Sequence, residues 1–181
     1  MSTEGIKQRR QQADYLNIGT PEDEEFVFMG KGFTELNEEP GAQTKSRRYI
    51  NDATSTSSIT GYESTFPFNA DQIPSEKAIK YIVDVGKYRK TGADSETQYV
   101  TVDLDDPVPE QTNKFNARMF QVAIEVSSFT DDEGEYTCEG NLNQKGDPVI
   151  GVFDTTTLTF TASGEDSSAV VGQSDVGGTT V

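Results

Sequence analysis

Three residue types are scarce in this chain, and each scarcity argues against a class of function. The 181 residues contain no histidine, which removes the commonest general base, the usual catalytic triads, and most zinc and iron sites. The chain also contains no tryptophan, a large aromatic side chain well suited to flat binding platforms. Cys138 is the single cysteine, so no intrachain disulfide can form. The composition therefore argues against ordinary hydrolytic chemistry and against a disulfide-stabilised secreted domain.

Apolar residues are also sparse. The hydrophobic fraction is 33%, and with glycine counted and tyrosine left out it is about 38%, below the ~45–50% of typical globular chains. The sequence has no run of 18 apolar residues, so we expect no membrane-spanning helix. Because Lys7, Arg9 and Arg10 are not followed by an apolar run, we also expect no ordinary signal peptide. A cytosolic origin and one domain with unpacked ends fit these observations.

Positive charge is nearly absent from the second half of the chain. The formal net charge is −16, of which residues 91–181 carry −14 while residues 26–90 carry +1. Affinity for duplex DNA comes largely from Lys and Arg side chains that displace counterions from phosphates. The balance therefore argues against tight DNA binding, and a highly soluble surface is its simplest interpretation.

The first seventy residues predict an arm, a strand, a long loop and a second strand. Residues 1–25 are polar with few apolar anchors, which indicates an arm. The aromatic and β-branched run 26–37 predicts a strand with a bulge or bend at its two glycines. Residues 38–65 contain a Ser- and Thr-rich run with few apolar partners, so they predict a long, loosely ordered hairpin or loop. Residues 61–70 predict a strand in which Pro67 marks an edge position or an end.

One helix is predicted over residues 75–85. Ser75 is suited to the N-cap and Gly86 to the position after the last helical turn. The apolar side chains are spaced so that they form one stripe, which should lie on the sheet: Ala78, Ile79, Ile82 and Val83.

The remainder of the chain predicts antiparallel strands. Tyr99–Leu104 and Phe120–Val126 alternate apolar and polar residues, as half-buried strands with one solvated face do. Further strands are separated by predicted turns at 131–134, 143–148 and 154–156. Residues 163–181 are mostly Gly, Ser, Thr and Asp, which predicts a disordered tail. The structured domain is therefore expected over residues 26–162.

Carboxylates are the remaining candidates for chemistry. Asp105-Asp106 and Asp131-Asp132-Glu133 lack the apolar surroundings that would raise a carboxyl pKa, so we interpret them as turn acids. The glycine-rich segment 86–92 does not have the residue order of a phosphate-binding loop. Cys138 lies in an alternating strand with nothing cationic beside it, which indicates a small core residue. We expect no catalytic residue, cofactor or metal.

Five stretches in order resemble the major tail proteins, or tail tube proteins, of long-tailed phages that infect Gram-positive bacteria. They are DYLNIGT (14–20), FMGKGFTELNEEPGAQT (28–44), RRYINDATSTSSITGYESTFPF (47–68), IKYIVDVGKYRKTGADSET (79–97) and GNLNQKGDPVIGVFDTTTLTFT (140–161). The resemblance covers about residues 14–161 and includes no catalytic signature.

The resemblance implies a fold and an assembly. The implied fold is mainly β, with two packed antiparallel sheets in a barrel-like sandwich and one flanking α-helix. The implied function is a structural virion protein whose rings, usually of six copies, stack head to tail into a tube that conducts DNA. The implied partners are further copies of the chain, the tape measure protein, the tail terminator and the distal tail proteins. Genomic DNA would pass through without specific binding. The protein would be assembled in the host cytoplasm and reside in the phage tail, and the resemblance favours a flexible, non-contractile tail.

Two surfaces are expected to serve that assembly. The segment 42–60 is expected to order only between rings, as a stacking loop. Its contact residues are expected to be Thr44, Arg47, Arg48, Tyr49, Ile50, Asn51, Thr54, Ser57 and Ile59. Acids facing the channel would repel phosphate and let DNA slide, and the candidates are Asp103, Glu125 and Glu139.

Two alternatives remain open at this point. A monomeric β-sandwich that binds carbohydrate or mediates adhesion would share the strand pattern. Such modules present exposed aromatic platforms, whereas the aromatic residues here lie in apolar strand contexts that indicate a core: Phe66, Phe68, Tyr99, Phe120 and Phe153. A histidine-free hydrolase built on carboxylates is the third hypothesis.

Overall fold

The computed structural model describes residues 5–163 of the chain. Within this range the protein is mainly β with one α-helix, as predicted. The strands are β1 (Gln12–Asn17), β2 (Phe26–Phe28), β3 (Phe33–Leu36), β4 (Ala42–Arg47), β5 (Thr56–Tyr62), β6 (Thr65–Asp71), β7 (Glu96–Pro107), β8 (Lys114–Asp132), β9 (Glu135–Asp154) and β10 (Thr159–Ala162). The helices are α1 (Lys77–Lys87) and the short 3-10 turns η1 (Arg9–Gln11) and η2 (Gly92–Ser95).

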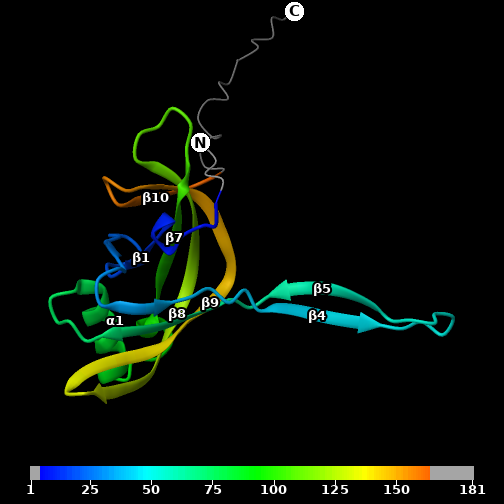
Figure 1. Ribbon diagram of the computed structural model, residues 1–181, viewed down its shortest axis with the longest axis horizontal. Coiled ribbons are helices and arrows are strands. Elements are labelled where there is room, and N and C mark those ends of the chain that lie inside the picture. The colour runs from blue at the N-terminus through cyan, green and yellow to red at the C-terminus, as the bar shows by residue number, and fades with distance from the viewer. Residues whose placement is uncertain (1–4, 164–181) are drawn as a thin grey trace, which may run out of the picture.

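Eight of these strands form one antiparallel sheet, and β4 and β5 form a separate hairpin. The order in the sheet is β2-β1-β7-β8-β9-β6-β3, with β10 paired to β9. The sheet curls into an open half-barrel (Figure 1). Phe66 of β6 packs against Tyr99 of β7 and Phe120 of β8, with ring centroids 4.7 and 4.9 Å away. The two packed sheets that the resemblance implied are thus two parts of one sheet that bend toward each other.

The core covers both faces of β1 and β7. Leu16 and Tyr99 belong to the main core beneath α1, whereas the neighbouring Tyr15 and Val100 belong to a second cluster around Phe153. Successive side chains of a strand point to opposite faces, so neither face of these strands is solvated here. The prediction of a solvated face along Tyr99–Leu104 is therefore wrong at Thr101, which is 2% exposed.

The aromatic core was predicted correctly, and its centre allows a direct test of stability. All five aromatic residues expected in the core are buried: Phe66, Phe68, Tyr99, Phe120 and Phe153. We expect Phe66→Ala to lower the free energy of unfolding by about 3–5 kcal/mol, because it leaves a cavity between the two parts of the sheet. Phe28→Ala, at a side chain that is 57% exposed, is the control and should cost less than about 1 kcal/mol. Denaturant unfolding of the unassembled protein measures both, and equal losses would contradict this view of the core.

Helix α1 begins and ends two residues later than predicted. Glu76 occupies the N-cap, and Gly86 lies inside the last turn rather than after it. A Cβ at residue 86 would come within 2.7–3.0 Å of Val126 and Phe129, so glycine allows the helix to pack closely on β8. The buried side chains of the helix are Ala78, Ile79, Ile82 and Val85, and Val83 is only partly buried.

The structure corrects the predicted arm and the start of the domain. Residues 12–17 form β1, which lies between β2 and β7 inside the sheet, and five of its six residues are buried. A strand covered on both faces does not alternate between apolar and polar residues, so the pattern gave no strand signal. The sheet therefore starts at Gln12 rather than at Phe26.

The predicted strand over 26–37 is two strands on different edges of the sheet. β2 pairs with β1, and β3 pairs with β6. The predicted bend lies between them at Gly32, whose φ of +87° favours glycine. A Cβ there would lie 2.6 Å from the Cδ1 atom of Ile79, so this glycine also lets the connection pass close to α1.

The predicted turn at 143–148 is wrong, because β9 continues through it. Met119 pairs with Val149 and Gln121 with Lys145, so the segment around Gly146 is a bulge that bends a single long strand. Glycine and proline mark turns and bulges alike, and the sequence alone does not separate them. The turns predicted at 131–134 and 154–156 are confirmed by the ends of β8 and β9.

The predicted tail lies outside the described residues apart from Ser163. No helix within residues 5–163 is long and apolar enough to cross a membrane.

Candidate assembly surfaces

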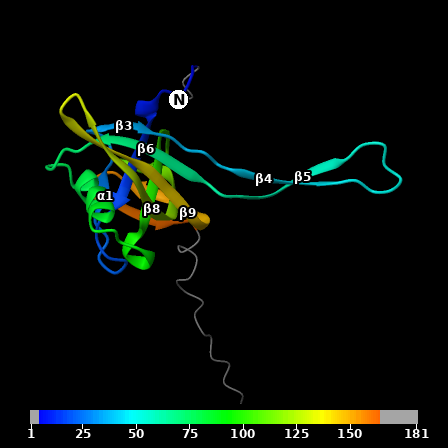
Figure 2. The same cartoon turned by 90° about the horizontal axis from the view of Figure 1, so that it is seen from below.

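The hairpin of β4 and β5 projects away from the curled sheet in both views (Figures 1 and 2). Every residue of β4 is exposed, as is every residue of β5 except the partly exposed Gly61. Its two strands pair with each other from Ala42–Tyr62 to Arg47–Thr56. The long hairpin or loop expected within residues 38–65 is therefore a hairpin, and the structure gives it a defined register.

The root of the hairpin is fixed by backbone hydrogen bonds. The amide N–H of Glu63 donates to the carbonyl of Gly41 at 3.1 Å, and Glu39 and Thr65 exchange two bonds of 2.8 and 2.9 Å. Gly41 has a φ of +61°, and a Cβ at this residue would lie 2.2 Å from the carbonyl oxygen of Glu63. The root therefore requires glycine and sets the direction in which the hairpin leaves the body.

The hairpin brings together all nine predicted stacking residues. Thr44 and Arg47 lie in β4, and Ser57 and Ile59 lie in β5. The other five lie in the connection between the strands: Arg48, Tyr49, Ile50, Asn51 and Thr54. Ile50 is fully exposed, and Tyr49 and Ile59 are 62% and 60% exposed. Exposed apolar side chains gathered on one projecting element are typical of a surface that another molecule covers.

Two of the predicted channel acids share a polar face of the sheet. Ile124 and Cys138 point into the main core, so the adjacent Glu125 and Glu139 point to the opposite face. Both acids are exposed. Glu125 accepts a hydrogen bond of 2.8 Å from the side-chain amide of Asn143, whose backbone partner on β8 is Ala123. This part of the sheet therefore presents amides and carboxylates on its uncovered side.

The third acid lies on the other face. Asp103 is four residues from Tyr99 along β7, so both side chains point to the face of the sheet that carries the main core. The Lys7 ammonium contacts Asp103 at 2.5 Å and Asp105 at 3.0 Å. The hydrogen bond from Lys7 lowers the pKa of Asp105 below its ordinary value. Asp103 thus anchors the N-terminal segment and does not join Glu125 and Glu139.

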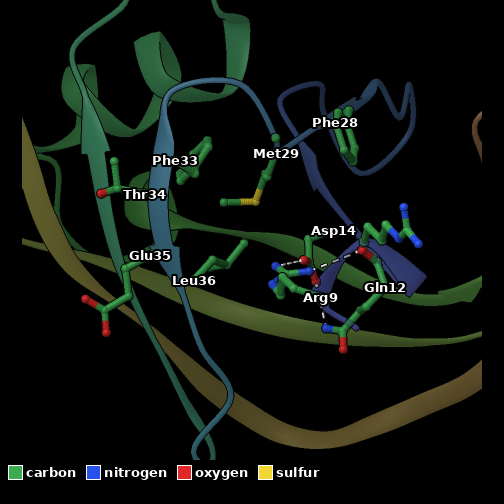
Figure 3. A pocket seen from close by; sticks show the side chains of 11 residues that line it. Arg9, Gln12, Asp14, Phe28, Met29, Phe33, Thr34, Glu35 and Leu36 are labelled. Carbon is green, nitrogen blue, oxygen red and sulfur yellow. Dashed lines mark hydrogen bonds and ion pairs between the residues drawn. The ribbon is translucent and has the colours of Figure 1, made fainter. Parts of the chain in front are cut away.

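A pocket of about 320 Å³ separates β1 from β3 (Figure 3). Arg9, Gln12 and Asp14 lie on one side of it and the residues of β3 on the other. Its full lining is Arg9, Arg10, Gln12, Asp14, Phe28, Met29, Gly30, Phe33, Thr34, Glu35 and Leu36. The pocket marks the seam where the curled sheet stays open.

A buried carboxylate at this seam escaped the sequence prediction. Asp14 is 1% exposed, and it accepts hydrogen bonds from the Tyr99 hydroxyl at 2.8 Å and the Gln12 amide at 3.1 Å. Its other oxygen pairs with the Arg9 guanidinium. Burial, and then the nearby Asp14 charge, raise the pKa of Tyr99 well above its ordinary value. This network holds η1 and the start of β1 in place. Its only signal in the sequence is the position of Asp14, two residues before Leu16 and therefore on the same face of the strand.

Cys138 is confirmed as a core residue. It is 1% exposed, and burial, with a smaller contribution from Glu139, raises the pKa of its thiol to about 11. The thiol is therefore protonated at neutral pH and a poor nucleophile. Among residues 5–163, no three His, Cys, Asp or Glu side chains are placed to hold a metal ion.

Comparisons of the chain with known proteins found a similarity in structure and none in sequence. No protein-family model matches it, and no curated protein does. Among solved structures it is similar to a chain in a structure described as the cryo-EM structure of the anti-feeding prophage (AFP) baseplate, 6-fold symmetrised. The alignment covers 84% of this chain and 97% of that chain, with 6% sequence identity and a TM-score of 0.46. A likeness of this degree identifies no functional residue.

Proposed function

We propose that this protein is the tail tube subunit of a long-tailed phage, a structural virion protein whose copies form rings that stack into a conduit for DNA. The observation that carries the proposal is the hairpin of β4 and β5, which projects from the body with its strands exposed. The sequence resemblance over residues 14–161 includes this segment.

The hairpin supports assembly because it has free backbone edges. Among the described strands, β4 and β5 pair only with each other. Their outer N–H and C=O groups are therefore free to pair with a strand of another molecule. A hairpin that stands alone in water is marginally stable at best, so contact with a neighbouring copy would add much of its order.

The curled sheet supports a channel wall. Glu125 and Glu139 lie on the part of the sheet where the face opposite the main core is exposed, while α1 covers the main core on the other face. Lys145 lies on the same face as Glu125 and is held by an ion pair with Glu96 at 2.5 Å. A wall of amides and carboxylates offers phosphate groups little to bind, so DNA would slide along it.

Electron microscopy of the purified, concentrated protein tests the proposal. We expect rings or tubes to form, with hexameric rings as the expected symmetry, and we expect assembly to depend on protein concentration. Tape measure, tail terminator and distal tail proteins are the expected partners at the ends of the tube. A particle that stays monomeric at all concentrations and in the presence of tail initiator proteins would refute the proposal and favour the monomeric binding module.

A further inference from the structure

The two faces of the hairpin differ in charge. Beyond the shift in register after Gln43, Lys45 pairs with Ser58 and Arg47 with Thr56. These four side chains therefore share one face, which we call the basic face (Lys45, Arg47, Thr56 and Ser58). The other face carries Thr44, Ser46, Ser57 and Ile59, and a contact of 2.9 Å between the hydroxyls of Ser46 and Ser57 agrees with that placement. One face of the hairpin is thus cationic and the other is uncharged.

Lys45 and Arg47, the cations of the basic face, form no ion pair among residues 5–163. Residues 42–62 carry three basic side chains and one acidic side chain, a net charge of +2, which leaves −18 on the rest of the molecule. Six of the other basic residues form ion pairs within the described range: Lys7, Arg9, Lys31, Lys77, Arg118 and Lys145. Across the same range, neither Lys45 nor Arg47 takes part in one of these pairs. The basic face is therefore free to meet an acidic surface on another molecule.

Acidic segments lie on the side of the body that faces away from the hairpin. The loop between β1 and β2 contains four consecutive acids, Glu22–Glu25, of which Glu25 is paired with Lys77. The turn between β8 and β9 is bordered by Asp132 and Glu135, which pair across the strands. In both views the hairpin points to one side, and this loop and turn lie on the other (Figures 1 and 2).

We propose that the basic face of the hairpin docks on the acidic end of a second copy of this chain, formed by its β1–β2 loop and its β8–β9 turn. This inference rests on the proposed function and specifies how stacked copies recognise each other. A projecting element and a complementary surface at opposite ends of one molecule make a heterologous contact, which repeats without closing and therefore builds a filament. The complementary charges fix which end of one copy meets which end of the next.

Removing the two cations tests the contact. We expect Lys45→Ala with Arg47→Ala to raise the critical concentration for tube formation by at least about tenfold. Lys80→Ala with Lys87→Ala is the matched control, because it removes two exposed cations of α1 that form no ion pair among residues 5–163 and so changes the net charge by the same amount. The control should assemble within about threefold of the unchanged protein. Equal effects of the two variants would overturn the assignment of the contact to the basic face.

Charge reversal identifies the partner surface. Lys45→Glu with Arg47→Glu should not assemble, and adding either Glu22→Lys with Glu24→Lys or Asp132→Lys with Glu135→Lys should restore tubes. Rescue by at least one pair supports the proposal, and rescue by neither overturns it.

If the Lys45→Ala with Arg47→Ala variant assembled normally but lost binding to duplex DNA, nucleic acid would be the partner instead. In that case the proposed function would stand, because unchanged protein would still form tubes, whereas failure of the unchanged protein to form them would refute the function itself.

Discussion

Deleting Thr44–Ser58 is expected to leave a folded, soluble protein that no longer forms tubes. Gln43 and Gly61 already face each other across the hairpin, so the deletion leaves Ile59 and Thr60 as a two-residue connection between them, a common hairpin length. The removed segment contains all nine predicted contact residues except Ile59, and its exposed side chains contribute little to the core. The fold should therefore survive while the contact between copies is lost.

Three measurements separate the outcomes of this deletion. Circular dichroism should show unchanged β content, and the free energy of unfolding should fall by no more than about 1 kcal/mol. Electron microscopy and light scattering should show no rings or tubes at concentrations at which the unchanged protein assembles. Tubes of normal length from the deletion variant would reject the stacking role of the hairpin.

The sequence was sufficient to predict elements whose signal is local. The exposed hairpin follows from a Ser- and Thr-rich segment that has no apolar partners, and the turn before Glu135 follows from its run of acids and a glycine. The aromatic core was predictable because buried aromatic residues sit in alternating strands. Each of these features depends on residues close together in the chain.

The features that the sequence missed depend on what packs from elsewhere. β1 was interpreted as part of an arm because residues 1–25 are polar with few apolar anchors, yet its polar residues Asp14 and Asn17 are buried. Their hydrogen-bond partners come from distant segments: Tyr99 donates to Asp14, and Asn17 donates to Gln98. Burial of a polar group requires such partners, and pairings across more than eighty residues leave no periodic signal.

The grouping of the predicted acids failed for a similar reason. Asp103, Glu125 and Glu139 each alternate with apolar neighbours, so each was expected to point away from the core face of its own strand. Asp103 instead lies on the side of the main core. The sequence does not say which face of β7 is the core, since Val100 and Val102 are buried on one face and Tyr99 on the other. Only the register between strands places Asp103 on the side opposite to Glu125 and Glu139.

Reversing the two acids that do share a face should impair DNA passage without preventing assembly. In Glu125→Lys with Glu139→Lys, cations replace carboxylates on the uncovered side of the sheet, far from the hairpin in the chain. Both side chains are exposed and neither forms an ion pair among the described residues, so the fold and the tube should persist. Phosphate groups of the DNA would then bind the lysines of the wall. The affinity of this binding should fall as the salt concentration rises. We expect infectivity to fall by about tenfold or more, with slower DNA ejection in vitro that recovers at higher salt.

A neutral variant separates repulsion from simple loss of a side chain. Glu125→Gln with Glu139→Gln keeps the shape and the amide character of the face, so its ejection rate should lie between those of the unchanged particle and the lysine variant. Asp103→Asn, on the opposite face, should loosen the Lys7 contact and leave ejection unchanged, because its carboxylate is held by Lys7 and does not face the proposed channel. Normal ejection from particles that carry both lysines would mean that this face of the sheet points away from the DNA.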